Sequence, residues 1–315
     1  MMGGACYLGV DGGGTKTRFV LIDADARPLA QVELGTTYVP QVGLDGARAV
    51  LARGIADVLD ASGCSPADIA WAFFGLPAHG EDSRITGQLD ALPFAILGHR
   101  RYACGNDMLC GWAGSLACAD GINIVAGTGS IGYGQRNGRE ARAGGWGEVF
   151  SDEGSAHWIA IRGLNAYSRM SDGRLPKGPL HAIVNAAFGL QRDLDLCAHV
   201  YGEGAGARSD IARLSKLVAE AARQGDAEAL RIYREAGAEL AAIADALRIA
   251  LGFDAGEHVP VSWSGGAFSA GELLLAPFRD GLHAACPGFE LRAPLHEPHI
   301  GAALYAMRPP APPQR

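Results

Sequence analysis

The sequence predicts an α/β protein of two domains with related topology. Its 315 residues are more than one ordinary hydrophobic core organises, so two domains are expected. A strand, a turn of glycine and hydroxyl-bearing residues and a returning strand occur at residues 6–23 and recur at residues 122–135. Apolar residues at helical spacing over 42–61, followed by an aliphatic run at 69–75, indicate a crossover between strands. The recurrence is a weak internal repeat, which favours two domains built alike.

Elements of the first half follow from the spacing of apolar residues. Short runs of aliphatic and β-branched residues predict strands at 6–10, 18–23, 29–34, 69–75 and near 94–97. Only short turns separate the first three runs, so they are expected to form an antiparallel meander. The helix over 42–61 ends at Ser62 and Gly63, and another helix is expected from Met108 to Ala117.

The second half begins with the same strand pattern and then becomes mostly helical. Strands are expected at 122–126 and 131–135, and Asn137-Gly138 directly after them is a strong signal for a two-residue hairpin. Periodicity and turn residues predict the remaining elements, which are helices at 210–223, 227–251 and 298–307, a strand at 259–263 and a disordered proline-rich tail at 309–315.

Composition restricts the classes of partner. The chain is 48% hydrophobic and 19% charged, which is the range of globular proteins, and its formal charge of −7 disfavours nucleic acid and anionic membranes. The seven cysteines show no CxxC pair, so we expect free thiols rather than a zinc site. With no secretory signal and no membrane-spanning run, we expect a cytoplasmic homodimer that binds a small molecule.

The glycine-rich segment at residues 9–17 is expected to bind phosphate. It is not a Walker A loop, because Thr15 rather than glycine precedes Lys16, and not a dinucleotide fingerprint, because a strand follows it. A β-hairpin remains, whose bare tip lets backbone N–H groups and hydroxyls approach phosphate oxygens. Asp11 at the strand end is placed to hold a magnesium ion through water. The expected phosphate-binding residues are Gly12, Gly13, Gly14, Thr15, Lys16 and Thr17.

Two later glycine turns are expected to bind the same nucleotide. Residues 127–132 match GxGxxG, but the following hairpin signal excludes a dinucleotide-binding helix, so Gly127 and Thr128 are interpreted as a second phosphate loop. Residues 264–267 follow a strand, and their two glycines would let a ring or a ribose lie against the backbone; a plain strand-to-helix turn is the alternative.

Asp107 has two interpretations that its local sequence leaves open. It lies at a strand-to-helix junction, where a carboxylate could accept a proton from an attacking hydroxyl. Alternatively, Asn106 or Asp107 caps the helix that follows. The glycine-tryptophan-glycine run before Asp152 is typical of a loop that closes over a sugar.

Taken in order, these motifs resemble the family that holds N-acetylglucosamine kinases, bacterial glucosamine kinases and the ATPase activators of 2-hydroxyacyl-CoA dehydratases. The similarity extends from residue 7 to about residue 307, and the GGWG…DEGS segment at 144–155 is its most specific part. The other matching segments are 11–17, 106–107, 127–130, 264–267 and 297–303.

The resemblance implies two ribonuclease-H-like domains of the actin and sugar-kinase fold with an ATP cleft between them. The domains would be residues 1–118, completed by a C-terminal helix at 294–308, and residues 119–293. It implies ATP and Mg²⁺ as cofactors and phosphorylation of the 6-hydroxyl of N-acetylglucosamine or glucosamine, with Asp107 as general base. Further implied nucleotide-binding residues are Gly127, Thr128, Gly265, Gly266 and Ala267, and implied sugar-binding residues are Thr37, Asp107, Gly129, Ser130, Gly145, Trp146, Gly147 and Asp152.

The sequence departs from this family in the first domain. Thr36-Thr37-Tyr38 stands where the sugar kinases carry an asparagine, and residues 76–80 replace a more glycine-rich loop. Two other functions stay open. An ATPase activator would need a cysteine-ligated cluster, for which only Cys104 and Cys110 are candidates. A nucleotide- or sugar-responsive switch is the second, although a first strand at about residue 5 leaves no room for a DNA-binding segment.

Overall fold

The computed structural model describes residues 5–202 and 207–308 and divides into two compact units. Unit 1 holds Met1–Ala119 and Ala293–Arg315, and unit 2 holds Asp120–Arg292. The tail predicted at 309–315 lies outside the described residues. Within those residues, no helix is both long enough and apolar enough to cross a bilayer.

Unit 1 contains a five-stranded mixed sheet in the order β3-β2-β1-β4-β5. β1 to β3 form the predicted antiparallel meander, whereas β4 and β5 run parallel to β1. The strands are β1 (Cys6–Gly12), β2 (Lys16–Ile22), β3 (Pro28–Gly35), β4 (Ile69–Leu76) and β5 (Tyr102–Asn106). Their alternating apolar side chains, such as those of Leu8 and Val10 in β1, build the buried core.

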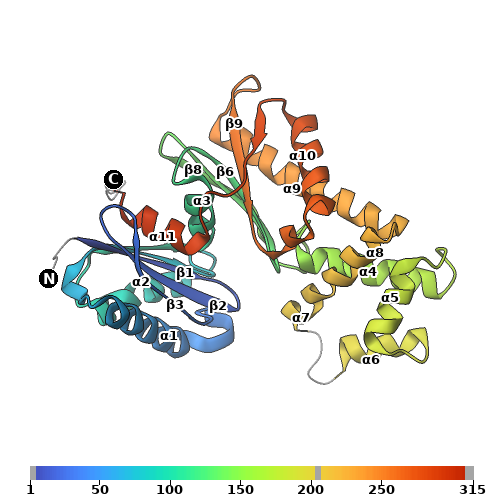
Figure 1. Ribbon diagram of the computed structural model, residues 1–315, viewed down its shortest axis with the longest axis horizontal. Helices are drawn as coiled ribbons and strands as arrows, with labels where there is room; N and C mark the ends of the chain where they lie inside the picture. Colours follow the sequence, from blue (N-terminus) through green and yellow to red (C-terminus); the bar gives the residue numbers. More distant parts are fainter. Residues whose placement is uncertain (1–4, 203–206, 309–315) are drawn as a thin grey trace. The chain divides into compact units, whose positions relative to one another are not determined.

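Helices cover both faces of this sheet (Figure 1). α1 (Val39–Ser62) and α2 (Ser83–Leu97) pack on the face of Leu8 and Val10, with the short helix η1 (Pro66–Asp68) before β4. α11 (Pro298–Ala306) lies beside α3 (Met108–Leu116) and packs on β1. A Cβ at Gly9 of β1 would lie 2.3 Å from the backbone nitrogen of Ala303, so α11 meets the strand at backbone distance. The end of the chain therefore completes unit 1.

The prediction of a strand near residues 94–97 is wrong, because these residues form the last turn of α2. Leu89, Leu92 and Leu97 are buried at helical spacing, and this pattern outweighs the short apolar run. The strand next to β4 is β5, which comes several residues later. Asn106 and Asp107 still follow a strand and precede a helix, as predicted.

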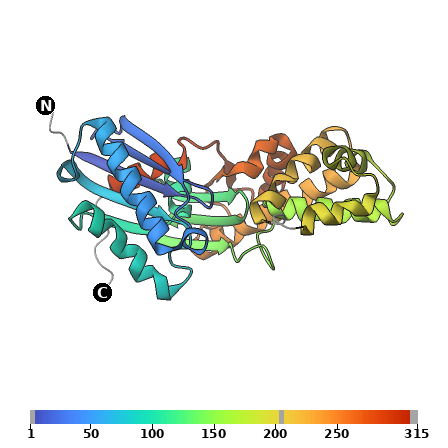
Figure 2. The ribbon, with the colours of Figure 1, turned by 90° about the horizontal axis from the view of Figure 1, so that it is seen from below.

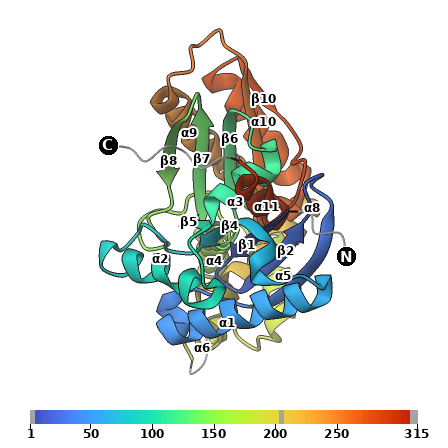
Figure 3. The same cartoon turned by 90° about the vertical axis from the view of Figure 1, so that its left-hand side faces the viewer.

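Unit 2 repeats the topology of unit 1. Its strands run in the order β8-β7-β6-β9-β10, with β6 to β8 antiparallel and β9 and β10 parallel to β6, and β6, β7 and β8 lie side by side in Figure 3. The strands are β6 (Gly121–Ala126), β7 (Ser130–Arg136), β8 (Arg139–Gly144), β9 (Val259–Ser264) and β10 (Phe289–Leu291). Asn137 and Gly138 form the predicted hairpin turn, with φ of 50° and 77°. The shared strand order confirms two domains of the ribonuclease-H-like, sugar-kinase fold.

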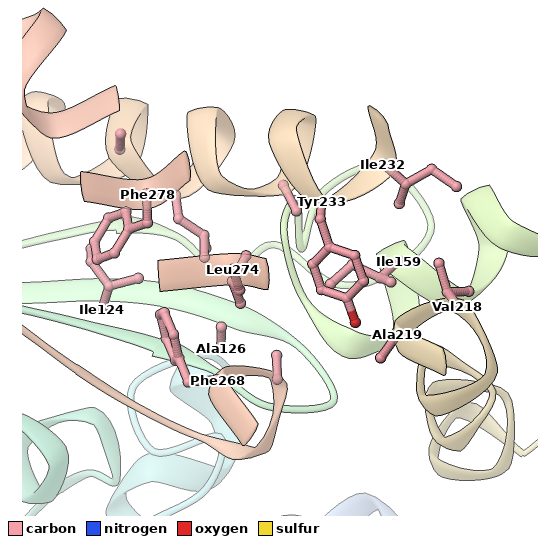
Figure 4. Close-up of a cluster of buried hydrophobic side chains, with 14 of the residues drawn as sticks. Ile124, Ala126, Ile159, Val218, Ala219, Ile232, Tyr233, Phe268, Leu274 and Phe278 are labelled. Carbon is pink, nitrogen blue, oxygen red and sulfur yellow. The ribbon is translucent and has the colours of Figure 1, made fainter. Parts of the chain in front are cut away.

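The helices of unit 2 enclose one large hydrophobic core. α9 packs along the sheet and against α10, and Figure 4 shows Ile124 and Ala126 of β6 facing Leu274 and Phe278 of α10. The helices α4 to α8, coloured lime to gold in Figure 2, lie together at one end of unit 2. The helices are α4 (Ala156–Ser171), α5 (Pro179–Phe188), η2 (Asp193–Asp195), α6 (Leu196–Tyr201), α7 (Arg208–Arg213), α8 (Ser215–Arg223), α9 (Ala227–Leu251), η3 (Gly266–Ala270) and α10 (Glu272–Ala285).

Candidate active site

Two acidic residues meet at the carboxyl ends of the parallel strands of unit 1. Asp11 on β1 pairs in register with Gly75 on β4. A Cβ at Gly75 would lie 3.3 Å from the Cα of Asp107, which directly follows β5. Gly75 thus lets the start of α3 approach the sheet and leaves Asp11 and Asp107 on either side of it. This edge is where parallel α/β sheets bind their ligands.

The structure shows which side chain caps α3. Asp107 occupies the N-cap position of α3, but its carboxylate makes no capping hydrogen bond. The neighbouring Asn106 accepts from the backbone N–H of Met108 at 3.2 Å instead. The amide of Asn106 also donates to the carbonyl of His79 at 3.2 Å and to the carboxylate of Glu81 at 3.4 Å. Asn106 therefore caps the helix, whereas the Asp107 carboxylate interacts with the backbone N–H groups of residues 107 and 108.

The surroundings of Asp107 keep its proton affinity high. Burial raises the pKa of Asp107 to about 7, and the negative charges of Asp11 and Glu81 act in the same direction. Burial likewise raises the pKa of Asp11 to about 6, against the opposing charge of Arg18. A carboxyl group whose pKa lies near neutrality is suited to accept a proton from a hydroxyl.

The first glycine loop is a tight hairpin, as predicted. The N–H of Gly13 donates to the carbonyl of Lys16 at 2.8 Å and closes the turn, whose residues Gly14 and Thr15 are exposed. A Cβ at Gly12 would lie 2.6 Å from the side-chain oxygen of Thr37, so only glycine fits there. The bare tip offers its backbone N–H groups to an anion.

Thr17 and Thr37 support this loop from inside. Both side chains are buried, and the hydroxyl of Thr17 donates to that of Thr37 at 3.3 Å. Thr36 donates to the carbonyl of Gly13 at 2.7 Å. In this structure the two threonines predicted to touch ligands, Thr17 and Thr37, thus brace the loop, while Thr15 is the exposed hydroxyl at its tip.

The Lys16 side chain forms an ion pair with a residue of the neighbouring strand β3. Its ammonium lies 2.8 Å from the carboxylate of Glu33, and about half of each side chain is exposed. We predict that Lys16→Ala weakens ATP binding by less than about fivefold, because an exposed ion pair contributes little. Gly14→Val should weaken ATP binding by about tenfold or more, because it covers backbone donors that bind a charged group. Isothermal titration of each variant with ATP measures both effects.

Gly14 is a fair test position because a Cβ there has no atom within 4 Å and its φ is not left-handed. Gly256, in a turn of unit 2, shares both properties and gives the matched control Gly256→Val, which should leave the ATP affinity unchanged. The opposite ranking, with Lys16→Ala the more damaging, would show that the lysine side chain rather than the loop backbone holds the phosphates.

In unit 2 the turn at residues 127–130, predicted to be the second phosphate loop, and the 264–267 turn lie together at the ends of parallel strands β6 and β9. Gly265 has a φ of 100°, and a Cβ there would lie 2.5 Å from the carbonyl of Ala126 and 2.8 Å from the nitrogen of Gly127. The carbonyls of Gly127 and Thr128 accept N–H groups from the first turn of α4 at 2.9 and 3.3 Å. Gly266 is exposed and Ala267 buried. The two predicted nucleotide segments therefore form one continuous surface.

The GGWG segment forms a protruding loop after β8. Gly144, Gly145 and Gly147 all have φ between 71° and 95°, which explains why glycine recurs there. Trp146 is 72% exposed, and the sequence did not single out two further exposed apolar residues of this loop, Val149 at 87% and Phe150 at 74%. With α9 the loop borders a hollow of about 510 Å³, lined by Ala143, Gly144, Trp146, Phe150, Ser151, Glu153, Glu239, Ala242, Ile243 and Ala246.

Asp152 and Ser130 are buried beside the second phosphate loop. The hydroxyl of Ser130 donates to the carbonyl of Glu153 at 2.7 Å, so it fixes the DEGS segment. The Asp152 carboxylate forms an ion pair with Arg208, on α7. No local sequence signal marks Arg208, since 56 residues separate it from Asp152.

Cys104 and Cys110, the two cysteines considered for the activator alternative, lie on β5 and α3 of unit 1. Cys110 is fully buried, and its thiol lies 3.7 Å from the carbonyl of Val10. Burial raises the pKa of the Cys104 thiol far above its usual value. Over residues 5–202 and 207–308, no three His, Cys, Asp or Glu side chains gather as a ready metal site.

Comparison with known proteins yields a family and close relatives in fold. The BadF/BadG/BcrA/BcrD ATPase family matches residues 8–306. An N-acetylmuramic acid/N-acetylglucosamine kinase from Clostridium acetobutylicum is 29% identical over 95% of this chain and 97% of its own. An N-acetyl-D-glucosamine kinase from Dictyostelium discoideum is 27% identical over 96% and 97%. The solved structure of a proposed N-acetylglucosamine kinase from Chromobacterium violaceum has a TM-score of 0.77 at 28% identity, covering 97% of this chain and 100% of that one.

Proposed function

We propose that this chain, which belongs to the BadF/BadG/BcrA/BcrD ATPase family, is an ATP-dependent kinase that phosphorylates the 6-hydroxyl of an amino sugar. The family predicted from the motifs is confirmed. N-acetylglucosamine and glucosamine are the substrates we propose first. Full-length relatives at 27–29% identity are an N-acetylmuramic acid/N-acetylglucosamine kinase and an N-acetyl-D-glucosamine kinase, and a relative at 24% identity is a glucosamine kinase.

The observation that carries this proposal is the Asp107 carboxylate at the end of β5. It makes no hydrogen bond that caps α3, and its pKa lies near neutrality. Asp107 would accept the proton of the sugar 6-hydroxyl as the oxygen forms its bond to the γ-phosphorus. The bond from that phosphorus to the bridging oxygen breaks, and ADP leaves with the electron pair. Such a loose transfer needs positioning and charge stabilisation more than covalent help.

The glycine loops would bind the nucleotide. We propose that residues 12–17, through their exposed tip, and Gly127 and Thr128 bind the phosphates, and that Gly265, Gly266 and Ala267 bind the adenosine. Asp11 suits a magnesium ion, because Mg²⁺ prefers carboxylate oxygen and usually binds proteins through only one or two carboxylates. A bound Mg²⁺ would neutralise phosphate charge and lower the proton affinity of both acidic residues.

The sugar would be held by the loop of unit 2 that carries Trp146 and by Asp152. An exposed indole beside backbone groups freed by glycine is suited to the apolar face and the hydroxyls of a sugar ring. Ser130 and Thr37 are proposed to act through the segments they brace, since their own hydroxyls already have protein partners.

A coupled assay of ADP release tests the proposed function. Purified protein is given ATP and Mg²⁺ with glucosamine, N-acetylglucosamine, glucose, N-acetylmannosamine or an anhydro sugar. We expect ADP release to rise well above the basal rate with at least one amino sugar and less with glucose. Equal turnover of glucose and both amino sugars would overturn the amino-sugar assignment alone. A rate that no sugar raises would overturn the kinase proposal and favour the activator or the switch.

A further inference from the structure

Arg208 joins α7 to the segment of residues 144–155 that is proposed to bind the sugar. Its guanidinium forms an ion pair with the Asp152 carboxylate, and its Nε lies 3.1 Å from a carboxylate oxygen of Glu148. The Asp152 side chain is 3% exposed, so its charge is removed from water and depends on this partner. Glu148 belongs to the loop that carries Trp146. One arginine therefore links α7 to two positions of the GGWG…DEGS segment that are four residues apart.

The ion pair packs directly on the second phosphate loop. A Cβ at Gly129 would lie 2.4 Å from the guanidinium nitrogen of Arg208 and 2.7 Å from a carboxylate oxygen of Asp152. Glycine at this position thus leaves the space that the pair fills. Asp152 also has a φ of 62°, a left-handed conformation that costs a non-glycine residue free energy. A strained, buried and paired carboxylate is a common feature of a ligand-binding position.

Charged and titratable side chains surround Asp152. Burial raises the pKa of Asp152, the charge of Arg208 is the largest opposing influence, and the charge of Glu148 raises it further. His157 at the start of α4 also faces this cluster, and burial lowers its pKa. Glu153 next to Asp152 accepts a hydrogen bond from Ser151 at 3.1 Å. Without the guanidinium, burial and Glu148 would both favour the protonated form of Asp152, and only the backbone N–H groups of Ser130 and Gly147 would oppose them.

We propose that Arg208 is a positioning residue for the sugar, which holds the Asp152 carboxylate ionised and fixed against the second phosphate loop. Asp152 can then accept hydrogen bonds from sugar hydroxyls. Arg208 also holds the loop that carries Trp146 in a fixed position relative to residues 127–130. This inference rests on the proposed function, because it assigns the residue that prepares the sugar-binding carboxylate.

The test compares Arg208→Gln with wild type in steady-state kinetics from pH 5.5 to 9, using the amino sugar that the ADP-release assay selects. We expect KM for the sugar to rise by about tenfold or more, since a charge-assisted contact is lost. KM for ATP should change by less than about twofold. The fall of kcat/KM for the sugar at acid pH (the acid limb) should also become steeper than in wild type, because Asp152 as well as Asp107 must then lose a proton.

Two further variants test whether Arg208 positions Asp152 or only stabilises α7. Arg213→Gln is the matched control, since Arg213 lies on the same helix, is 71% exposed and pairs with Asp210 at 2.7 Å. It should leave KM and the pH profile unchanged. Arg208→Lys keeps the positive charge, so it should restore the acid limb while KM for the sugar stays raised. It also tests the proposal if the glutamine variant does not fold.

The outcomes distinguish this inference from the proposed function. If wild type phosphorylates the sugar and Arg208→Gln, or Arg208→Lys in its place, keeps the wild-type KM and acid limb, Arg208 merely supports the fold and the inference fails while the kinase stands. If titration of wild type with glucosamine and N-acetylglucosamine, followed by intrinsic tryptophan fluorescence with Trp146→Phe as the reference, shows binding of neither, the proposed function and this inference fail together.

Discussion

Replacement of Asp107 by asparagine should lower kcat by about 10²-fold or more, the usual contribution of a positioned general base. The amide has nearly the same shape but cannot take the proton of the sugar hydroxyl. Affinity for ATP should stay within a few-fold of wild type, because the glycine loops that would bind it are elsewhere. Single-turnover kinetics with the sugar, together with titration by ATP, measures the two effects separately.

Stability supplies the control for this variant. The pKa of Asp107 is higher in the folded chain than its usual value, so the stability that its protonated form contributes is lost as pH rises toward 7. Asparagine carries no charge and avoids this loss, so the variant should melt no lower than wild type at pH 8. A variant that melts normally and retains near-normal turnover would exclude Asp107 as the base.

The same pKa predicts how wild-type activity depends on pH. In the free enzyme the base must be deprotonated, so kcat/KM for the sugar should fall as pH drops below about 7. The profile is measured at saturating Mg²⁺ and ATP, where a bound cation would move this limb to lower pH, because its charge lowers the proton affinity of Asp107.

Local signals explain what the sequence could predict. Both glycine hairpins were predictable, because turn residues and strand runs adjoin each other within a few positions. The burial of Thr17 also had a signal, since Thr17, Phe19 and Leu21 alternate on the inner face of β2. By contrast, β10 has only three residues, which is too short for any pattern to reveal.

Long-range packing explains what the sequence could not predict. Arg208 lies on a short helix after an unremarkable segment, and only the folded chain brings it to Asp152. The choice of Asn106 over Asp107 as the cap depends on the loop at residues 79–81, which also takes hydrogen bonds from Asn106. Such contacts are set by how the loops and helices pack, and no fixed spacing along the chain encodes them.

Gly301→Ala should destabilise unit 1 by about 3 kcal/mol, the upper part of the range for overpacking a close contact. A Cβ at Gly301 of α11 would lie 2.1 Å from the backbone nitrogen of Gly114 and 2.3 Å from the carbonyl of Cys110, both on α3. Backbone atoms on two packed helices cannot yield as a flexible side chain would, so α11 must separate from α3. Differential scanning calorimetry measures the loss.

The matched control is Gly87→Ala in the middle of α2, where a Cβ meets no atom within 4 Å. There the substitution should raise stability by about 0.5–1 kcal/mol, because alanine favours the helix over glycine. The same change in two helices is thus expected to have opposite signs. Since α3 starts directly after Asp107, Gly301→Ala should also lower kcat at temperatures where unit 1 is still folded. Stabilisation by Gly301→Ala, as in the control, would show that α11 does not pack against α3 at backbone distance.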